Sequence, residues 1–378
     1  MNERRVPDAP PYLDALLRSQ KVIVCCGAGG VGKTTTAAAL GLAAARQGRR
    51  VLVLTIDPAR RLGEALGLRE SGPTPSHVER AGTMDAWMLD PRVVFEDMVR
   101  RLTADEVKVQ RILQNKLYRA LRDLVAGMQE YTAAEALYGF VESGKYDLVV
   151  LDTPPSRNAL EFLEAPRKFA LFLDERIVGV FMPVEGGAGV LMRGARSLVV
   201  NIFDRVFGEG FLGEVEEFLS AFSGMFSAMR GHSEAVRSLL TGPQASFVVV
   251  TSPEPSAIDE GQFLHAHLAK MGLPFAGYVL NRSWAYTRGL NGPESIALPA
   301  DASDALRSGH EKLCQLAEHE RRLAARDRAL LATLSARGKP ALATPNLGGA
   351  IEDFDGLLAL AESFLVRERS PDALTSAS

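Results

Sequence analysis

Short, continuously apolar runs recur along the chain, and several of the intervals between them carry helical patterns. Uninterrupted apolarity, without alternation of apolar and polar residues, is typical of parallel strands that are covered by helices on both faces. The layout therefore predicts an α/β fold with a mostly parallel sheet between helices. The predicted strands are residues 21–26, 50–56, 85–90, 146–152, 245–251, 276–281 and 341–345.

Two long tracts, residues 91–144 and 158–242, carry no strand signal. We predict that both form one helical subdomain inserted into the α/β core. In the second tract, apolar side chains step by three or four residues, as on one side of a helix. This seam could line an adaptable client groove or simply pack inside the subdomain, and packing is the preferred interpretation. Its residues are Phe211, Val215, Phe218, Phe222, Met225 and Met229.

Composition and charge narrow the class of protein. The core domain is expected to span residues 18–367, and the polar tail 368–378 is expected to be disordered. No uncharged apolar run approaches the roughly 18 residues of a membrane span, and no secretory signal is visible. Three cysteines without a CxxC pair fit a reducing cytosol. A net charge of −3 indicates no nucleic-acid partner.

A glycine-rich segment joins the first predicted strand to an alanine-rich helix. Its sequence from residue 27 is Gly-Ala-Gly-Gly-Val-Gly-Lys-Thr, which matches the phosphate-loop pattern GxxxxGK[ST]. Glycines let backbone N–H groups turn toward phosphate, and the start of the helix adds partial positive charge. Lys33 is expected to pair with the β- and γ-phosphates of ATP, and the Thr34 hydroxyl to ligate Mg²⁺. The predicted nucleotide-binding residues of this segment are Gly27, Gly29, Gly30, Val31, Gly32, Lys33, Thr34 and Thr35.

Two aspartates, Asp57 and Asp152, stand at the ends of buried strands. In open α/β sheets ligands bind at the carboxyl ends of the strands, so both carboxylates are predicted to lie near the phosphates. Asp152 suits the Mg²⁺ shell. Asp57 suits orienting or deprotonating the attacking water and, with Lys33, is the predicted catalytic residue. The alternative for each aspartate is a cap on the helix that follows.

Taken together, these segments resemble the arsenical pump (ArsA-like) ATPase family, which includes the ATPases that target tail-anchored membrane proteins. Residues 27–35, 55–59 and 152–155 resemble its deviant Walker A, switch I and switch II, and the resemblance extends through 247–254 and 277–281. It implies a SIMIBI-class P-loop fold and a nucleotide-gated dimer.

The resemblance also assigns roles to single residues. Asp57 and Asp152 match the two switch aspartates, and Asn281 matches the asparagine that recognises adenine. The sequence of residues 152–160 is most similar to that of the bacterial, actinobacterial-type branch.

Three departures from the family pattern limit what carries over. Ala28 stands where the family usually has a lysine that reaches the partner subunit's phosphates. Cys25 and Cys26 lie on a buried strand, so the arsenite-binding cysteines have no evident counterparts. The CxxC pair of the tail-anchor ATPases is absent, so no zinc is expected.

The predicted protein is a cytoplasmic Mg·ATP hydrolase that couples hydrolysis to movement of its helical subdomain. It would serve transport or the handling of a membrane-protein or other hydrophobic client, and could lie at the membrane through a partner. The alternative is a regulatory subunit with weak activity alone, paired with a paralogue that keeps the loop lysine. In a homodimer, Arg60 or Arg61 could supply that charge instead. A Min/Par-type positioning ATPase is disfavoured, because no C-terminal amphipathic helix is evident.

Overall fold

The structure is a computed structural model. It describes residues 11–56, 63, 66, 72–103, 106–114, 129–153, 231–285, 292–336, 340–348, 351 and 353–365. The chain divides into two compact units. The first comprises Met1–Met88, Gly144–Ser156 and Gly242–Ser378, and the second comprises Leu89–Ser143 and Arg157–Thr241.

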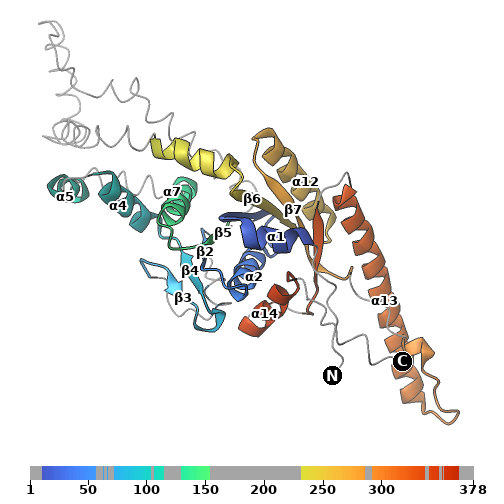
Figure 1. Ribbon diagram of the computed structural model, residues 1–378. Helices are drawn as coiled ribbons and strands as arrows, with labels where there is room; N and C mark the ends of the chain where they lie inside the picture. Colours follow the sequence, from blue (N-terminus) through green and yellow to red (C-terminus); the bar gives the residue numbers. More distant parts are fainter. Residues whose placement is uncertain are drawn as a thin grey trace, which may run out of the picture. The chain divides into compact units, whose positions relative to one another are not determined.

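The first unit contains an eight-stranded sheet in the order β3-β4-β2-β5-β1-β6-β7-β8 (Figure 1). Every neighbouring pair is parallel except β3 and β4. All seven predicted strands are confirmed, and β3 was not predicted. The strands are β1 Val22–Gly27, β2 Val51–Thr55, β3 Ser76–His77, β4 Met84–Met88, β5 Leu148–Asp152, β6 Ala245–Thr251, β7 Phe275–Ser283 and β8 Ala341–Pro345.

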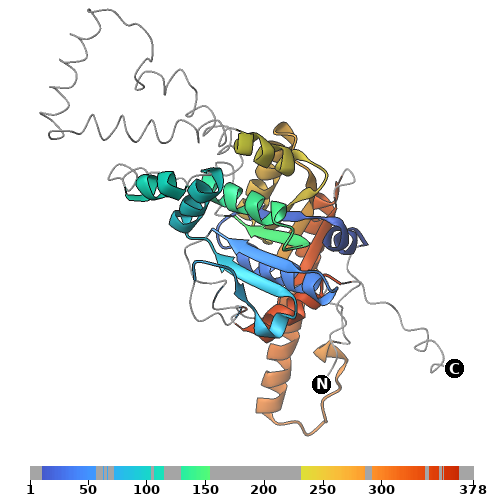
Figure 2. The same cartoon turned by 60° about the vertical axis from the view of Figure 1, so that its left-hand side comes forward.

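Helices cover both faces of this sheet, as the continuous apolar strands predict (Figure 2). Helix α2, Lys33–Arg46, lies on the face that presents Val53, and helix α12, Pro255–Lys270, lies on the face that presents Val249. The strand register aligns Val53 with Val150, Ile23 and Ser246 across the sheet. Val249 is three residues beyond Ser246 and therefore points to the opposite face.

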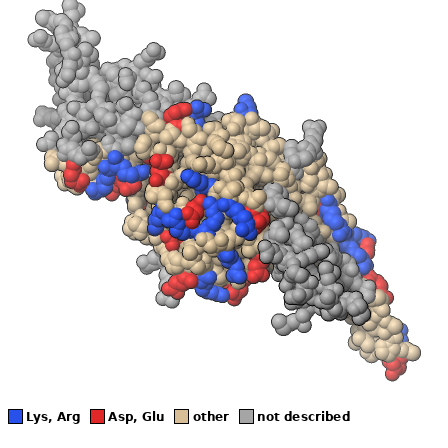
Figure 3. Space-filling model, in the orientation of Figure 1, with Lys and Arg blue, Asp and Glu red and all other residues tan. Residues whose placement is uncertain are grey.

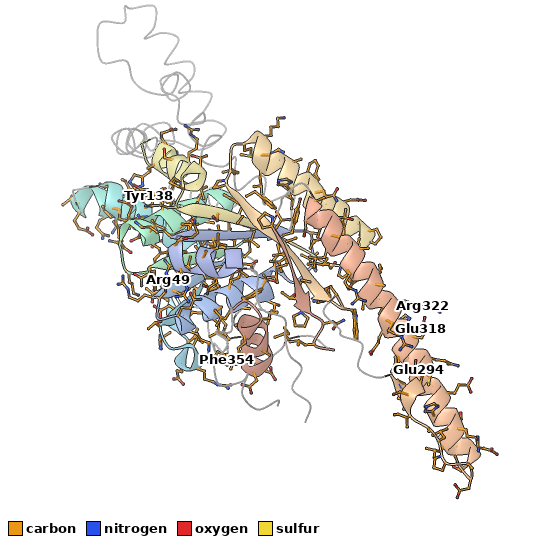
Figure 4. All side chains as sticks on the ribbon, turned by 45° about the vertical axis from the view of Figure 1, so that its right-hand side comes forward. Arg49, Tyr138, Glu294, Glu318, Arg322 and Phe354 are labelled. Atoms are coloured by element: carbon orange, nitrogen blue, oxygen red, sulfur yellow. The ribbon has the colours of Figure 1, made fainter. Side chains whose placement is uncertain are left out.

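Three further helices are described in the first unit. Helices α1, Pro11–Ser19, and α14, Phe354–Glu362, pack against α2. Helix α13, Asp304–Leu334, is 31 residues long and buries its later part against β7 and β8, through Ala324, Asp327 and Leu334. On its exposed part Arg322 donates a 3.0 Å hydrogen bond to Glu318 (Figure 4). Arg321 bridges Glu318 to Glu294. Two 3₁₀ turns occupy Glu79–Ala81 and Pro293–Ser295.

The elements that the structure describes in the second unit are all helical. They are α4 Pro91–Leu102, α5 Glu106–Gln114, α7 Gln129–Glu142 and residues 231–241. The carboxylate of Glu135 is 1% exposed and lies 2.8 Å from His232 and 3.7 Å from Arg101, so it links three of these helices. The predicted seam from Phe211 to Met229 lies outside the described residues.

Charged side chains of both signs are interspersed on the face shown in Figure 3. The surface ion pairs of the described residues include Arg50 with Asp147 at 2.6 Å and Arg18 with Asp14 at 2.9 Å. Exposed pairs of this kind contribute little to stability. Within the described part of the chain, we find no helix that combines the length and apolarity needed to cross a bilayer.

Candidate active site

The loop between β1 and α2 has the backbone of a phosphate cradle. Gly30 and Gly32 adopt φ values of +78° and +90°, in the left-handed region that favours glycine. A Cβ atom on Gly27 would lie 2.1 Å from the Val250 carbonyl oxygen, so only glycine fits there. At Gly29 and Gly30, by contrast, no atom lies within 4 Å of an added Cβ position. The middle of the loop is therefore open, and backbone N–H groups can meet an anion there.

Lys33 is the first residue of α2, and its side chain folds back over the loop. The residue is 8% exposed, and its ammonium donates a 2.7 Å hydrogen bond to the Ala28 carbonyl oxygen. Gly32 is the N-cap of α2 and has no side chain to cap the first turn. The positive end of the helix dipole and the lysine charge are thus brought to the same loop, as the motif predicts.

A carboxylate from the neighbouring strand meets the start of α2. Asp152, the last residue of β5, is 1% exposed, and its Oδ2 atom accepts a 2.7 Å hydrogen bond from the Thr34 hydroxyl. The same oxygen accepts a 3.0 Å bond from the hydroxyl of Thr55, which lies directly opposite Asp152 at the end of β2. The structure therefore brings the predicted pair Thr34 and Asp152 together.

Sequence reasoning missed Thr55 as a site residue. The available signal was a polar residue that ends an otherwise apolar strand beside the carboxyl edge of the sheet. The predicted site residue Asn281 lies on β7, and its amide contacts the phosphate loop at the Val31 carbonyl oxygen, 2.8 Å away. Asp57, Arg60 and Arg61 lie outside the described residues.

The two adjacent cysteines before the loop are part of the core. Burial raises the pKa of Cys25 well above its ordinary value, and the nearby Asp152 carboxylate adds to the effect. Burial also raises the pKa of Cys26 to about 12. Both thiols therefore stay protonated at neutral pH, whereas the thiolate is the form that binds soft metals.

A mostly parallel sheet whose inner strand runs into this loop, with a lysine, a threonine hydroxyl and an aspartate gathered beside it, defines a P-loop nucleoside triphosphatase. The chain belongs to the anion-transporting ATPase family, whose model matches residues 20–288. It is accordingly an ATP hydrolase that works on Mg·ATP.

Several named proteins are similar to this chain. ATPase ASNA1 homolog 1 of Paramecium tetraurelia is 26% identical over 72% of this chain and 78% of its own length. ATPase ARSA2 of Chlamydomonas reinhardtii is 27% identical over 69% of this chain and 67% of its own. ATPase GET3 of Malassezia globosa is 31% identical over 43% of this chain and 48% of its own, so that match spans about half of each protein.

We expect the Thr55→Val variant to need more Mg²⁺ for ATP hydrolysis. Valine keeps the shape of the side chain but removes a hydroxyl donor that holds Asp152. A net loss of about 1 kcal/mol in positioning would raise the half-maximal Mg²⁺ concentration roughly fivefold. A Mg²⁺ titration of the ATPase rate measures this.

Thr55→Ser, which keeps the hydroxyl, is the matched control and should restore the wild-type Mg²⁺ requirement. An unchanged requirement in Thr55→Val would show that Thr55 does not position Asp152.

Proposed function

We propose that this protein couples ATP hydrolysis at the phosphate loop to a conformational change of its helical unit, in the service of transport or of a membrane-protein or other hydrophobic client. The observation that carries the proposal is the convergence of Lys33, Thr34 and Asp152 at the carboxyl edge of the sheet. The proposed binding residues are those of the loop, Gly27 to Thr35, together with Asn281.

The donor set beside the loop fits Mg²⁺. The Thr34 hydroxyl and the Asp152 carboxylate are oxygen donors 2.7 Å apart, and hard oxygen ligands are what Mg²⁺ prefers. In the proposal Thr34 holds the ion directly, Asp152 holds it through water, and Thr55 keeps Asp152 in place. When bound, Mg²⁺ neutralises charge on the β- and γ-phosphates.

The chain's own residues would do the remaining work. Lys33 exchanges the Ala28 carbonyl oxygen for the β- and γ-phosphates, and the loop N–H groups hold the other phosphate oxygens. Asp57, two residues after β2 ends, orients the attacking water and takes its proton. The water oxygen then attacks the γ-phosphorus in line as the bond to ADP breaks.

The connectivity of the chain supports coupling to the helical unit. Helix α7 of that unit ends at Glu142 and leads into β5. Five residues after Asp152, the chain enters the same unit again at Arg157. A shift of Asp152 on hydrolysis would therefore act on two connections to the helical unit. The burial of Cys25 and Cys26 on β1 argues against these thiols as arsenite ligands. The actinobacterial-type branch stays a prediction.

A second candidate function is that of a regulatory subunit with little activity alone. Position 28 presents a buried methyl group, 6% exposed, where the family resemblance leads us to expect a lysine. A homodimer of this chain would lack that charge on both sides, unless Arg60 or Arg61 supplies it. A paralogue with the lysine would donate it across a heterodimer to the ATP bound here.

Measurements on the purified chain test both candidates. The second candidate predicts Mg·ATP binding with slow turnover, because a cation donated across the dimer can be worth about 10³ or more in rate. Adding a paralogue that keeps the lysine should raise the rate, and mutating that lysine should remove the gain.

Two results would contradict these proposals. A chain that fails to bind Mg·ATP would overturn the proposed ATP site. An isolated chain that hydrolyses ATP as fast as the mixture would overturn the heterodimer, and so would an unchanged rate in a homodimer of Ala28→Lys.

A further inference from the structure

We infer that Asn281 and Thr344 form a brace that holds the phosphate loop in its phosphate-accepting conformation, so that both are positioning residues for the triphosphate. The inference rests on the proposed ATP site. The two residues act on that site from strands farther along the sheet. Strands β7 and β8, which carry them, are separated from β1 by β6.

The brace is a chain of two buried hydrogen bonds. The Asn281 amide nitrogen donates to the Val31 carbonyl oxygen at 2.8 Å, and the Asn281 amide oxygen accepts from the Thr344 hydroxyl at 2.7 Å. Asn281 is 5% exposed and Thr344 is fully buried. A carbonyl oxygen only accepts hydrogen bonds, so Val31 determines which end of the amide faces the loop. With both ends bonded, the Asn281 side chain is held in one orientation.

The bond to Val31 also orients the next N–H group of the loop. The Val31 carbonyl and the Gly32 N–H belong to one peptide unit, and in a trans peptide they point in opposite directions. With the carbonyl bonded to Asn281, the Gly32 N–H is turned away from Asn281 and can meet a phosphate oxygen. An added Cβ at Gly32 would lie 2.2 Å from the Asn281 amide nitrogen, so the amide sits directly against the residue before Lys33.

An irregularity in the sheet aims Asn281 at the loop. Leu280 pairs with Ala343 and Ser283 pairs with Pro345, so Asn281 and Arg282 together oppose the single residue Thr344. Such bulges redirect side chains and are common beside functional sites. Arg282 adopts a φ of +56°, and among the described residues it is the one non-glycine residue with a positive φ. A non-glycine residue in this conformation persists where its surroundings hold it.

A buried carboxylate on α13 secures the end of the bulge. Asp327, fully buried, accepts a 2.8 Å bond from the Trp284 N–H and a 3.2 Å bond from the Ser283 hydroxyl. The Ser283 carbonyl in turn accepts from the Asn346 N–H at 3.0 Å, beyond the end of β8. The residues that follow Asn281 are thus bonded both to α13 and to the segment after β8, and these bonds hold the end of the bulge in place.

The test compares Thr344→Val with Thr344→Ser, because Thr344 is not expected to touch the nucleotide. Dissociation constants are measured by calorimetry for three probes in Mg²⁺: ATP, GTP and inorganic tripolyphosphate. Thr344→Val should raise the dissociation constants of all three probes about tenfold, which corresponds to about 1.4 kcal/mol of binding free energy. The ratio of ATP to GTP affinity should stay unchanged. Thr344→Ser keeps the hydroxyl and should bind all three as the wild type does.

Three outcomes would overturn the brace: unchanged binding in Thr344→Val, a loss confined to ATP, or no recovery in Thr344→Ser. A loss confined to ATP would instead support adenine recognition by Asn281. If Thr344→Val does not fold, the dissociation constants of the same three probes are measured for Asn281→Ala. A wild-type chain that binds none of them would overturn the proposed ATP site and the brace together. Binding by the wild type with no change in Thr344→Val would overturn the brace alone.

Discussion

Lys33→Ala is expected to weaken Mg·ATP binding and its hydrolysis by more than a hundredfold, or about 3 kcal/mol. The ammonium group is the cation that the loop motif brings to the β- and γ-phosphates, and it acts at a largely buried position where its charge is weakly screened. The ammonium also donates to the Ala28 carbonyl oxygen and has further contacts within the protein. A thermal melt of the variant checks that the chain still folds, and calorimetric titration with Mg·ATP measures the loss of binding.

Lys270→Ala is the matched control. Lys270 ends α12 at an exposed position, and its removal takes away the same charge without touching the loop. It should bind Mg·ATP as the wild type does. Tight, Mg²⁺-dependent binding by Lys33→Ala would contradict the assignment of the loop as the phosphate site.

Asp57→Asn is expected to lower the turnover number by a factor of about 10² or more while Mg·ATP still binds. The amide has the shape of the carboxylate but cannot take a proton from the attacking water. Single-turnover hydrolysis, measured beside equilibrium binding, separates these two effects.

The comparison variant is Asp152→Asn, whose carboxylate is bonded by Thr34 and Thr55. It should instead raise the Mg²⁺ concentration that hydrolysis requires. If Asp57→Asn turned over normally but failed to bind ATP, Asp57 would be a binding residue and not the one that activates water.

Much of the α/β core could be predicted because its signals are local. A strand that is buried on both faces is apolar at most positions, so β1, β2 and β5 stand out as apolar runs that are polar at most in their last residue, and β6 as an apolar run with a single serine inside it. Strand β3 was missed because Ser76–His77 is two polar residues paired at the sheet edge. Nothing in so short a segment distinguishes it from a loop.

Part of the candidate site was predictable for the same reason. The loop motif places the glycines, Lys33 and Thr34 within eight residues, so their spacing alone indicates phosphate chemistry. Asp152 is 118 residues from Thr34, yet it was found because parallel strands end at one edge of the sheet. That rule predicts which edge of the sheet a residue lies at, but not which residue it hydrogen-bonds.

The partners of the site residues were decided by the tertiary structure. Thr55 reaches Asp152 because β2 pairs with β5 in a register that sets these two residues side by side. Asn281 reaches Val31, 250 residues earlier in the chain, because a bulge between β7 and β8 redirects its side chain. Local sequence encodes which segments form strands, motifs and caps. Strand order, register and bulges depend on which distant segments pack together, so the sequence by itself determined the phosphate loop and the kind of sheet, and packing alone decided which side chains hold that loop in place.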